Sequence, residues 1–251
     1  MNGTVSVPEG DAMKRIALLW PIEATVLLAV VACGADLTLP GSPAPGFAVA
    51  VVQGDDQTGT VGEPLPAPVV IQVKTDDGQP LADRTVAFVA SPVAGGRFDP
   101  DTVVTDADGK ALTSWFLGTA AGVYTAEARL VAGGDAVPPP APLQATAGAA
   151  APDTLRATGP SVQGGRRGEP LDEPLAVIAV DRFGNPVGGA EVTWDASSGN
   201  GHLSERTTPT AADGTATVIW TLGNRVGVQQ ATATLAGAQG SPVTFAATVL
   251  F

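Results

Sequence analysis

The second half of this chain repeats the first. Residues 62–91, which begin GEPL, align without a gap with residues 168–197, which also begin GEPL, at an offset of 106 residues. After one deleted residue the likeness continues at an offset of 105, where Trp115 corresponds to Trp220. A period of about one hundred residues is too long for a solenoid and suits a globular domain. The repeat therefore predicts two tandem domains of similar fold.

Composition and periodicity favour short strands joined by turns. The chain has 31 glycines and 22 prolines in 251 residues, yet 44% of it is hydrophobic. Apolar residues recur with a period of two, which predicts strands with one buried face, and no stretch has helical spacing. The rows that match between the copies are Val69, Ile71 and Val73 with Leu175, Val177 and Ala179; Val86 and Phe88 with Val192 and Trp194; Ala111, Thr113, Trp115 and Leu117 with Ala216, Val218, Trp220 and Leu222; and Ala126, Ala128 and Leu130 with Ala231, Ala233 and Leu235.

Turn sequences separate these rows. Residues 76–80 (DDGQP) and 182–186 (RFGNP) place a glycine where a positive φ is expected, before a proline that cannot donate to a ladder. Asp-Gly pairs at 108–109 and 213–214 predict hairpins. About seven short strands per hundred residues is the pattern of an immunoglobulin-like sandwich.

We therefore predict an all-β fold of two tandem immunoglobulin-like β-sandwich domains. The first spans residues 47–147 and the second spans 154–251, with a short linker at 148–153. The matching aromatic residues, Phe88 or Trp194 with Trp115 or Trp220, are expected between the sheets.

The second copy resembles a known family. Residues 180–187 (VDRFGNPV), 189–194 (GAEVTW) and 212–216 (ADGTA) are similar to the bacterial Ig-like domain of group 1, the invasin and intimin type. The first copy is similar but looser, as at 77–81 (DGQPL) and 106–111 (DADGKA). The resemblance implies a module of the kind that stacks into rods at bacterial surfaces, some of which end in a receptor-binding tip.

The start of the chain has the layout of a secretory signal. Residues 13–15 (MKR) are cationic, residues 16–32 are mostly apolar, and a small residue precedes Cys33, the single cysteine. The segment resembles a bacterial lipoprotein signal peptide, which implies a diacylglycerol on the Cys33 thiol and cleavage just before it. We therefore expect a signal peptide at 1–32, with Met13 as the true start.

Further details of this segment bear on the anchor. The apolar stretch contains Trp20, Pro21 and Glu23, which argues against a membrane-spanning helix. The alternative is a buried cysteine in an N-terminal helix, but amphipathic spacing is missing around Cys33. Residue 34 is glycine and not the aspartate that resembles an inner-membrane retention signal, so in a Gram-negative cell we expect the outer membrane or cell surface. Residues 33–46 should form a Pro/Gly-rich tether.

Charge limits the partners. The formal net charge is −12, and nucleic acids and anionic lipid headgroups require a cationic surface. We therefore expect no nucleic-acid partner and a membrane contact through the lipid anchor. Arg166 and Arg167 are too few to form a cationic patch, and the polyproline run at 138–140 is expected to stiffen a loop rather than dock a partner.

Catalytic and metal-binding patterns are sparse. His202 is the single histidine, expected in a solvated loop, and no Gly-x-Ser-x-Gly elbow accompanies it. Its counterpart in the first copy is Arg97 or Phe98. We expect no cofactor and no metal; the candidate calcium ligands, Asp99, Asp101, Asp106 and Asp108, do not fit the spacing of an EF-hand loop.

These observations predict a non-enzymatic, lipid-anchored cell-envelope protein. It would act as a surface spacer or an adhesion or binding module, with a protein or glycan partner. The alternative is a carbohydrate- or peptidoglycan-associated accessory domain of an exported enzyme system. That role needs flat aromatic rings on the surface, whereas Trp115, Trp194 and Trp220 fall on the expected core faces.

Overall fold

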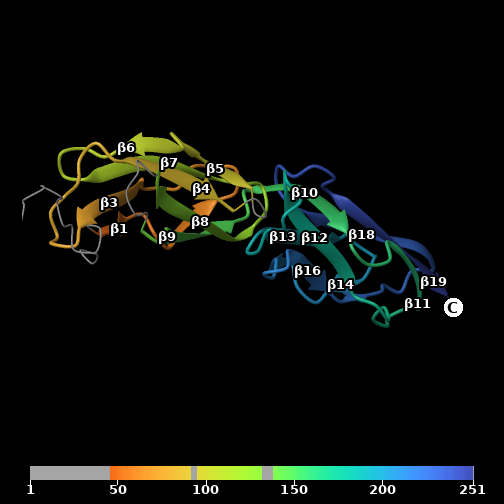
Figure 1. The fold of residues 1–251 in the computed structure, drawn as a ribbon. Coiled ribbons are helices and arrows are strands. Elements are labelled where there is room, and N and C mark those ends of the chain that lie inside the picture. The colour runs from red at the N-terminus through yellow and green to blue at the C-terminus, as the bar shows by residue number, and fades with distance from the viewer. Residues whose placement is uncertain (1–45, 92–94, 132–137, 251) are drawn as a thin grey trace, which may run out of the picture. The chain divides into compact units, whose positions relative to one another are not determined.

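The computed structural model describes residues 46–91, 95–131 and 138–250. Across these ranges the regular elements are strands, so the predicted all-β class is confirmed. Within them we find no helix that could cross a membrane. The described residues belong to one compact unit that contains two hydrophobic cores, one for each repeat. The tandem pair of immunoglobulin-like sandwiches is therefore the fold of this chain (Figure 1).

The first repeat is a sandwich of two sheets. One sheet has the order β1-β3-β7-β5 and the other has the order β2-β9-β8-β4-β6. Its strands are β1 (Phe47–Gln53), β2 (Gln57–Thr60), β3 (Val69–Thr75), β4 (Thr85–Ala90), β5 (Gly96–Asp99), β6 (Thr102–Val104), β7 (Lys110–Leu117), β8 (Gly122–Leu130) and β9 (Ala141–Gly148).

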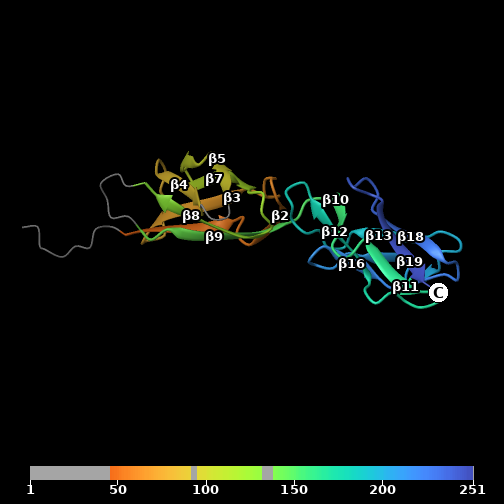
Figure 2. The ribbon, with the colours of Figure 1, turned by 90° about the vertical axis from the view of Figure 1, so that its right-hand side faces the viewer.

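The second repeat has the same strand order with one interruption. Its larger sheet has the order β11-β19-β18-β13-β15, and Figure 2 labels β11, β19, β18 and β13 of this sheet. The opposite layer is divided into β10-β12-β16 and β14-β17. The division arises because the strand equivalent to β7 is broken at Ile219. Its strands are β10 (Pro152–Ala157), β11 (Val162–Arg166), β12 (Leu175–Asp181), β13 (Glu191–Ala196), β14 (His202–Leu203), β15 (Thr207–Pro209), β16 (Thr215–Val218), β17 (Trp220–Thr221), β18 (Gly227–Thr234) and β19 (Val243–Leu250).

The first strands of each repeat are shared between its two layers. β1 pairs antiparallel with β3, whereas β2, four residues further on, pairs parallel with β9. The side chain of Gln57 holds this crossover, because its Nε2 donates to the carbonyls of Gly54 and Ala67 and its Oε1 accepts from the Ala67 N–H. In the second repeat β11 pairs parallel with β19 in the same way.

The Asp-Gly turns do not close hairpins, so that prediction is wrong. The turns are tight and their glycines, Gly109 and Gly214, have φ of 70° and 77°. However, β6 pairs with β4 while β7 pairs with β3 and β5, so the first turn carries the chain from one sheet to the other. The second turn does the same between β15 and β16. A local turn signal fixes the reversal of the chain but not the sheet that each flanking strand joins.

The predicted core rows are confirmed. Trp115 and Trp220 are at most 1% exposed, and Trp194 and Phe88 are also buried. In the first repeat Phe98 stacks on Trp115 with ring centroids 5.1 Å apart, and in the second Trp194 packs near Phe245. Each core is aliphatic with a few large aromatic anchors.

We expect Trp220→Ala to lower the free energy of unfolding of the second repeat by roughly 3–5 kcal/mol, because it leaves a large cavity between the sheets. It also removes the donor to the Asn200 carbonyl, at 2.8 Å from Nε1. Denaturant unfolding followed by circular dichroism measures the change. The neighbouring Ile219 is 52% exposed, so Ile219→Ala is the matched control and should cost less than about 0.5 kcal/mol. Equal losses in the two variants would contradict this assignment of the core.

Candidate functional site at the junction of the repeats

Cys33, the predicted lipidation site, lies outside the described residues. The same is true of the rest of the predicted signal peptide and of nearly all of the tether. The lipid anchor therefore stays a prediction from the sequence.

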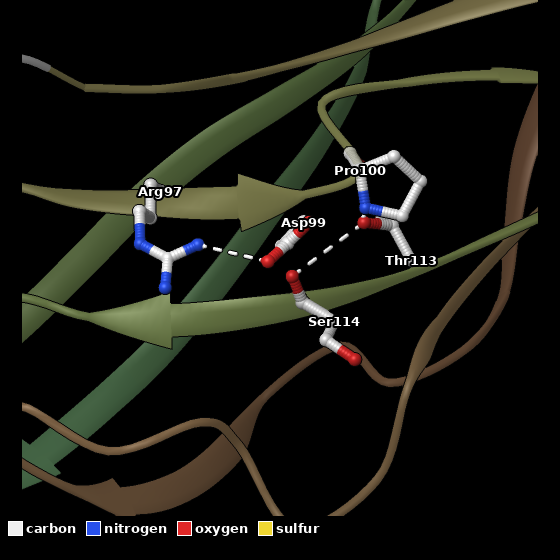
Figure 3. Close-up of polar contacts among 5 residues, drawn as sticks. All are labelled: Arg97, Asp99, Pro100, Thr113 and Ser114. Atoms are coloured by element: carbon white, nitrogen blue, oxygen red, sulfur yellow. Dashed lines mark hydrogen bonds and ion pairs between the residues drawn. The ribbon is translucent and has the colours of Figure 1, made fainter.

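The four candidate calcium ligands lie in the first repeat, and the carboxylates of Asp99, Asp106 and Asp108 have other partners. Figure 3 shows the Arg97 guanidinium beside Asp99, and the distance between Nη1 and Oδ2 is 3.2 Å. The Thr113 hydroxyl donates to the Pro100 carbonyl. The Asp106 carboxylate accepts the N–H groups of Asp108 and Lys110 within its turn. Asp101 contributes its backbone carbonyl to the Phe88 N–H.

These carboxylates do not form a metal centre with one another. Among the residues that the structure describes, no three His, Cys, Asp or Glu side chains are grouped closely enough to hold a metal ion.

The remaining predicted residues lie apart from one another. His202 is exposed at the start of β14, and its register opposite Thr221 makes Arg97, which lies opposite Phe116, its counterpart. Arg166 ends β11, and the polyproline run directly precedes β9. Together with the calcium candidates, they give no constellation suited to catalysis.

The best-built polar site of the described chain lies where the two repeats meet. The Asn185 side chain, in the turn after β12, donates from Nδ2 to the Thr119 carbonyl at 2.8 Å. Its Oδ1 accepts the Ala121 N–H at 2.9 Å. Both partners are backbone groups of the loop between β7 and β8 in the first repeat. One amide therefore bridges the repeats with a donor and an acceptor at once.

The Asp181 carboxylate holds this amide and the linker together. Oδ2 accepts the Asn185 Nδ2 at 2.8 Å and the Ala150 N–H at 3.0 Å, and Oδ1 accepts the N–H groups of Phe183 and Asn185, both at 2.9 Å. The Asp181 residue is only 2% exposed. Burial raises the pKa of this carboxyl, but the hydrogen bonds from Asn185, Ala150 and Phe183 outweigh that effect and hold the pKa below its ordinary value.

An aromatic contact completes the junction. Gly62 has φ of +76°, and a Cβ built on it would lie 3.1 Å from Cζ of Phe183, so the ring sits against the bare glycine. The Arg182 guanidinium lies over the same ring at 4.7 Å and approaches Glu63, with Nη2 3.6 Å from Oε1. The latter pair is exposed and contributes little by itself. The glycine is the more important feature, because any larger residue would displace the ring.

The surface of the first repeat that meets this turn is fixed by its own fold. We call Gly62, Glu63 and the loop 118–122 the receiving end of the first repeat. The Gly62 N–H donates to Gly118 at 2.8 Å, and the Tyr124 hydroxyl donates to the Ala120 carbonyl at 2.7 Å. Tyr124 is 1% exposed, so its hydroxyl holds the loop from the core side.

Sequence reasoning missed this site. It treated residues 182–186 as a turn and a family marker and assigned them no contact. One signal was present, because the tip reads Arg182-Phe183 in the second copy and Asp76-Asp77 in the first. In an acidic chain, an aromatic and a cation at the tip of an otherwise matching turn indicate a role for that tip.

Comparisons with known proteins agree with the fold. Residues 173–248 match the model of the bacterial Ig-like domain (group 1), which confirms the resemblance for the second repeat. No curated protein sequence matches the chain significantly. Among solved structures, the Escherichia coli adhesin FdeC is 18% identical, with a TM-score of 0.51, over 83% of this chain and 64% of that chain. This chain thus spans less than two thirds of FdeC, and at this identity the likeness is one of fold.

Two other similar solved structures have lower TM-scores. InvD of Yersinia pseudotuberculosis is 17% identical over 81% of this chain and 57% of that chain, with a TM-score of 0.42. The D00-D0 domain of intimin is 16% identical over 81% of this chain and all of that chain, with a TM-score of 0.40.

We expect Asn185→Ala to expose the Ala121 N–H. Loss of one hydrogen bond of about 1 kcal/mol should speed amide exchange at Ala121 roughly 3- to 10-fold, measured by NMR. Gln79→Ala is the matched control, because Gln79 is the exposed counterpart of Asn185 in the first repeat and should leave this rate unchanged. Unaltered exchange in Asn185→Ala would show that the junction does not persist in solution.

The junction should weaken in acid. Because folding lowers the pKa of Asp181, its stabilisation is fully present above the ordinary aspartate pKa of about 3.9 and is lost as the pH falls through the lowered value. Exchange at Ala121, corrected for the intrinsic effect of pH, should therefore accelerate below about pH 4. Asp181→Asn should remove this acid step and show fast exchange at neutral pH as well. An acid step of equal size in that variant would assign the effect to another group.

Proposed function

We propose that this chain, whose second repeat is a bacterial Ig-like domain of group 1, is a non-enzymatic spacer or binding module of the bacterial cell envelope. The observation that carries the proposal is the junction. Asn185 and Phe183 link the repeats through their own side chains, in addition to the covalent linker. Such a connection suits a module that holds one end of a chain at a defined place relative to the other.

Several features support a non-enzymatic role. His202 is exposed, and in the described part of the chain it belongs to no metal-binding group of three or more His, Cys, Asp or Glu residues. The carboxylate of Asp181 accepts four hydrogen bonds, all from the turn and the linker, and the residue is only 2% exposed.

We place the anchor at Cys33. In this proposal residues 1–32 are the signal peptide, 33–46 the tether, 47–147 and 154–251 the two modules, and 148–153 the linker. The lipid would hold the chain at the cell envelope, with the outer membrane or cell surface as its location. FdeC is an adhesin, and by analogy the partner of this chain would be a protein or a glycan.

The rival role, a carbohydrate- or peptidoglycan-associated accessory domain, finds less support. Sugar platforms need exposed flat rings. Trp115, Trp194 and Trp220 are each 2% exposed or less. Their indoles are therefore unable to stack on a glycan without unfolding of the sandwich.

Mass spectrometry of the protein from native membranes should find a lipid on an N-terminal Cys33 and none of residues 1–32. Cys33→Ser should shift the chain from the detergent phase to the aqueous phase in a partitioning assay, or leave an uncleaved precursor. Its melting temperature should not change, because Cys33 precedes both cores. A free Cys33 thiol on protein released from the envelope would overturn the anchoring proposal.

A further inference from the structure

The far end of the second repeat is built like the receiving end of the first. Gly168 has φ of +73°, close to the +76° of its counterpart Gly62. The Glu169 N–H donates to Arg166 at 3.2 Å, as the Glu63 N–H donates to the residue three positions earlier at the same distance. The Leu222 N–H donates to the Glu169 carbonyl at 2.9 Å, which again matches the first repeat. One bond differs, because the Gly168 N–H donates to the Leu222 carbonyl at 3.1 Å, one residue before the counterpart of Gly118. The other backbone bonds that hold the receiving end of the first repeat are reproduced.

The adjoining loop is also fixed in the same manner. The buried Gln229 occupies the position of Tyr124, and its Nε2 donates to the Arg225 carbonyl at 2.7 Å. The corresponding bond in the first repeat is that of Tyr124 to Ala120. The loop therefore presents the Asn224 carbonyl and the Val226 N–H, the counterparts of the two groups that Asn185 binds.

Within the described chain these groups have no such partner. The nearest atom to a Cβ built on Gly168 is the Asn224 Oδ1 at 3.5 Å, where the first repeat has an aromatic ring. No described residue is hydrogen-bonded to the Asn224 carbonyl or the Val226 N–H, and the Val226 side chain is 39% exposed.

We propose that this end, defined by Gly168, Glu169, Asn224 and Val226, docks another Ig-like module through an Asp-Arg-Phe-Gly-Asn turn. The aromatic ring would cover Gly168, the asparagine amide would pair with Asn224 and Val226, and the arginine would lie near Glu169. This inference follows from the contacts between the repeats and does not depend on the lipid anchor or on the spacer role.

A second copy of this chain is not the partner. The turn after β3 in the first repeat carries Asp76, Asp77 and Gln79 where the docking turn has Arg182, Phe183 and Asn185. Asp76 would face Glu169 with like charge, and Asp77 offers no ring to cover Gly168. Asp76 instead accepts the Gly46 N–H at 2.9 Å within its own repeat. The turn therefore rejects head-to-tail stacking of identical copies, and the partner must be a different module with an Arg-Phe tip.

The test gives the turn at residues 75–80 the sequence of the docking turn. Thr75→Asp, Asp76→Arg, Asp77→Phe and Gln79→Asn together make residues 75–80 identical to 181–186. In the chain from Gly34 onward, this graft should produce open head-to-tail association. Sedimentation at about 1 mM should show a rise of roughly 1.5-fold in weight-average mass, which corresponds to a Kd of about 3 mM. The unmodified chain should remain a monomer at the same concentration.

The matched control adds Gly168→Asn to the graft. Asparagine tolerates a positive φ but places a Cβ in the path of the ring, so association should disappear. A folded graft that stays monomeric would overturn the proposal, as would association that survives Gly168→Asn or occurs in the unmodified chain.

A second measurement leaves the first turn intact, in case the graft unfolds. Residues 148–251 are fused again after Phe251, so that a native docking turn follows the proposed surface. Amide exchange at the first Val226 should then slow roughly 3- to 10-fold, as expected for one new hydrogen bond. Unchanged exchange at that Val226 would overturn the proposal independently of the graft.

Discussion

Four hydrogen bonds converge on the Asp181 carboxylate, and the connection between the repeats depends on them. They fix the turn after β12, orient the Asn185 amide toward the first repeat and hold the linker at Ala150. A buried charge of this kind is tolerable only when it is fully hydrogen-bonded. In the first repeat Thr75 stands in this position and its hydroxyl accepts one N–H at 3.2 Å. The same turn is therefore a connector in one repeat and an ordinary surface loop in the other.

The core residues could be predicted from the sequence because the pattern that marks them, alternation of apolar residues along a strand, is local. A period of two places Trp115 and Trp220 on buried faces, and the alignment of the copies supports each row with a second example. The Asp-Gly turns show what local patterns do not predict. Reversal of the chain at Gly109 is local, but the choice of sheet for β6 and β7 depends on strands distant in the sequence.

The contacts between the repeats could not be predicted from the sequence, for a related reason. Asn185 bonds to residues 64 and 66 positions earlier, and no periodicity links an asparagine to two backbone groups at that separation. The composition of the turn gave a hint, but its partners are a glycine and main-chain atoms, which carry no distinctive side chains. Lipidation of Cys33 remains a prediction from the sequence, as do the module boundaries.

The parallel pairing of β2 with β9, and of β11 with β19, has a mechanical consequence. These strands lie near opposite ends of their repeat in the sequence, and they run in the same direction. A force that pulls the two ends of the repeat apart therefore slides one strand along the other and loads the whole ladder in shear. The hydrogen bonds must then break together rather than one after another. The rate at which each repeat extends under force is therefore set by the height of its unfolding barrier. When a chain of this kind is pulled at both ends, the parallel pairing of β2 with β9 and of β11 with β19 keeps each repeat folded under tension.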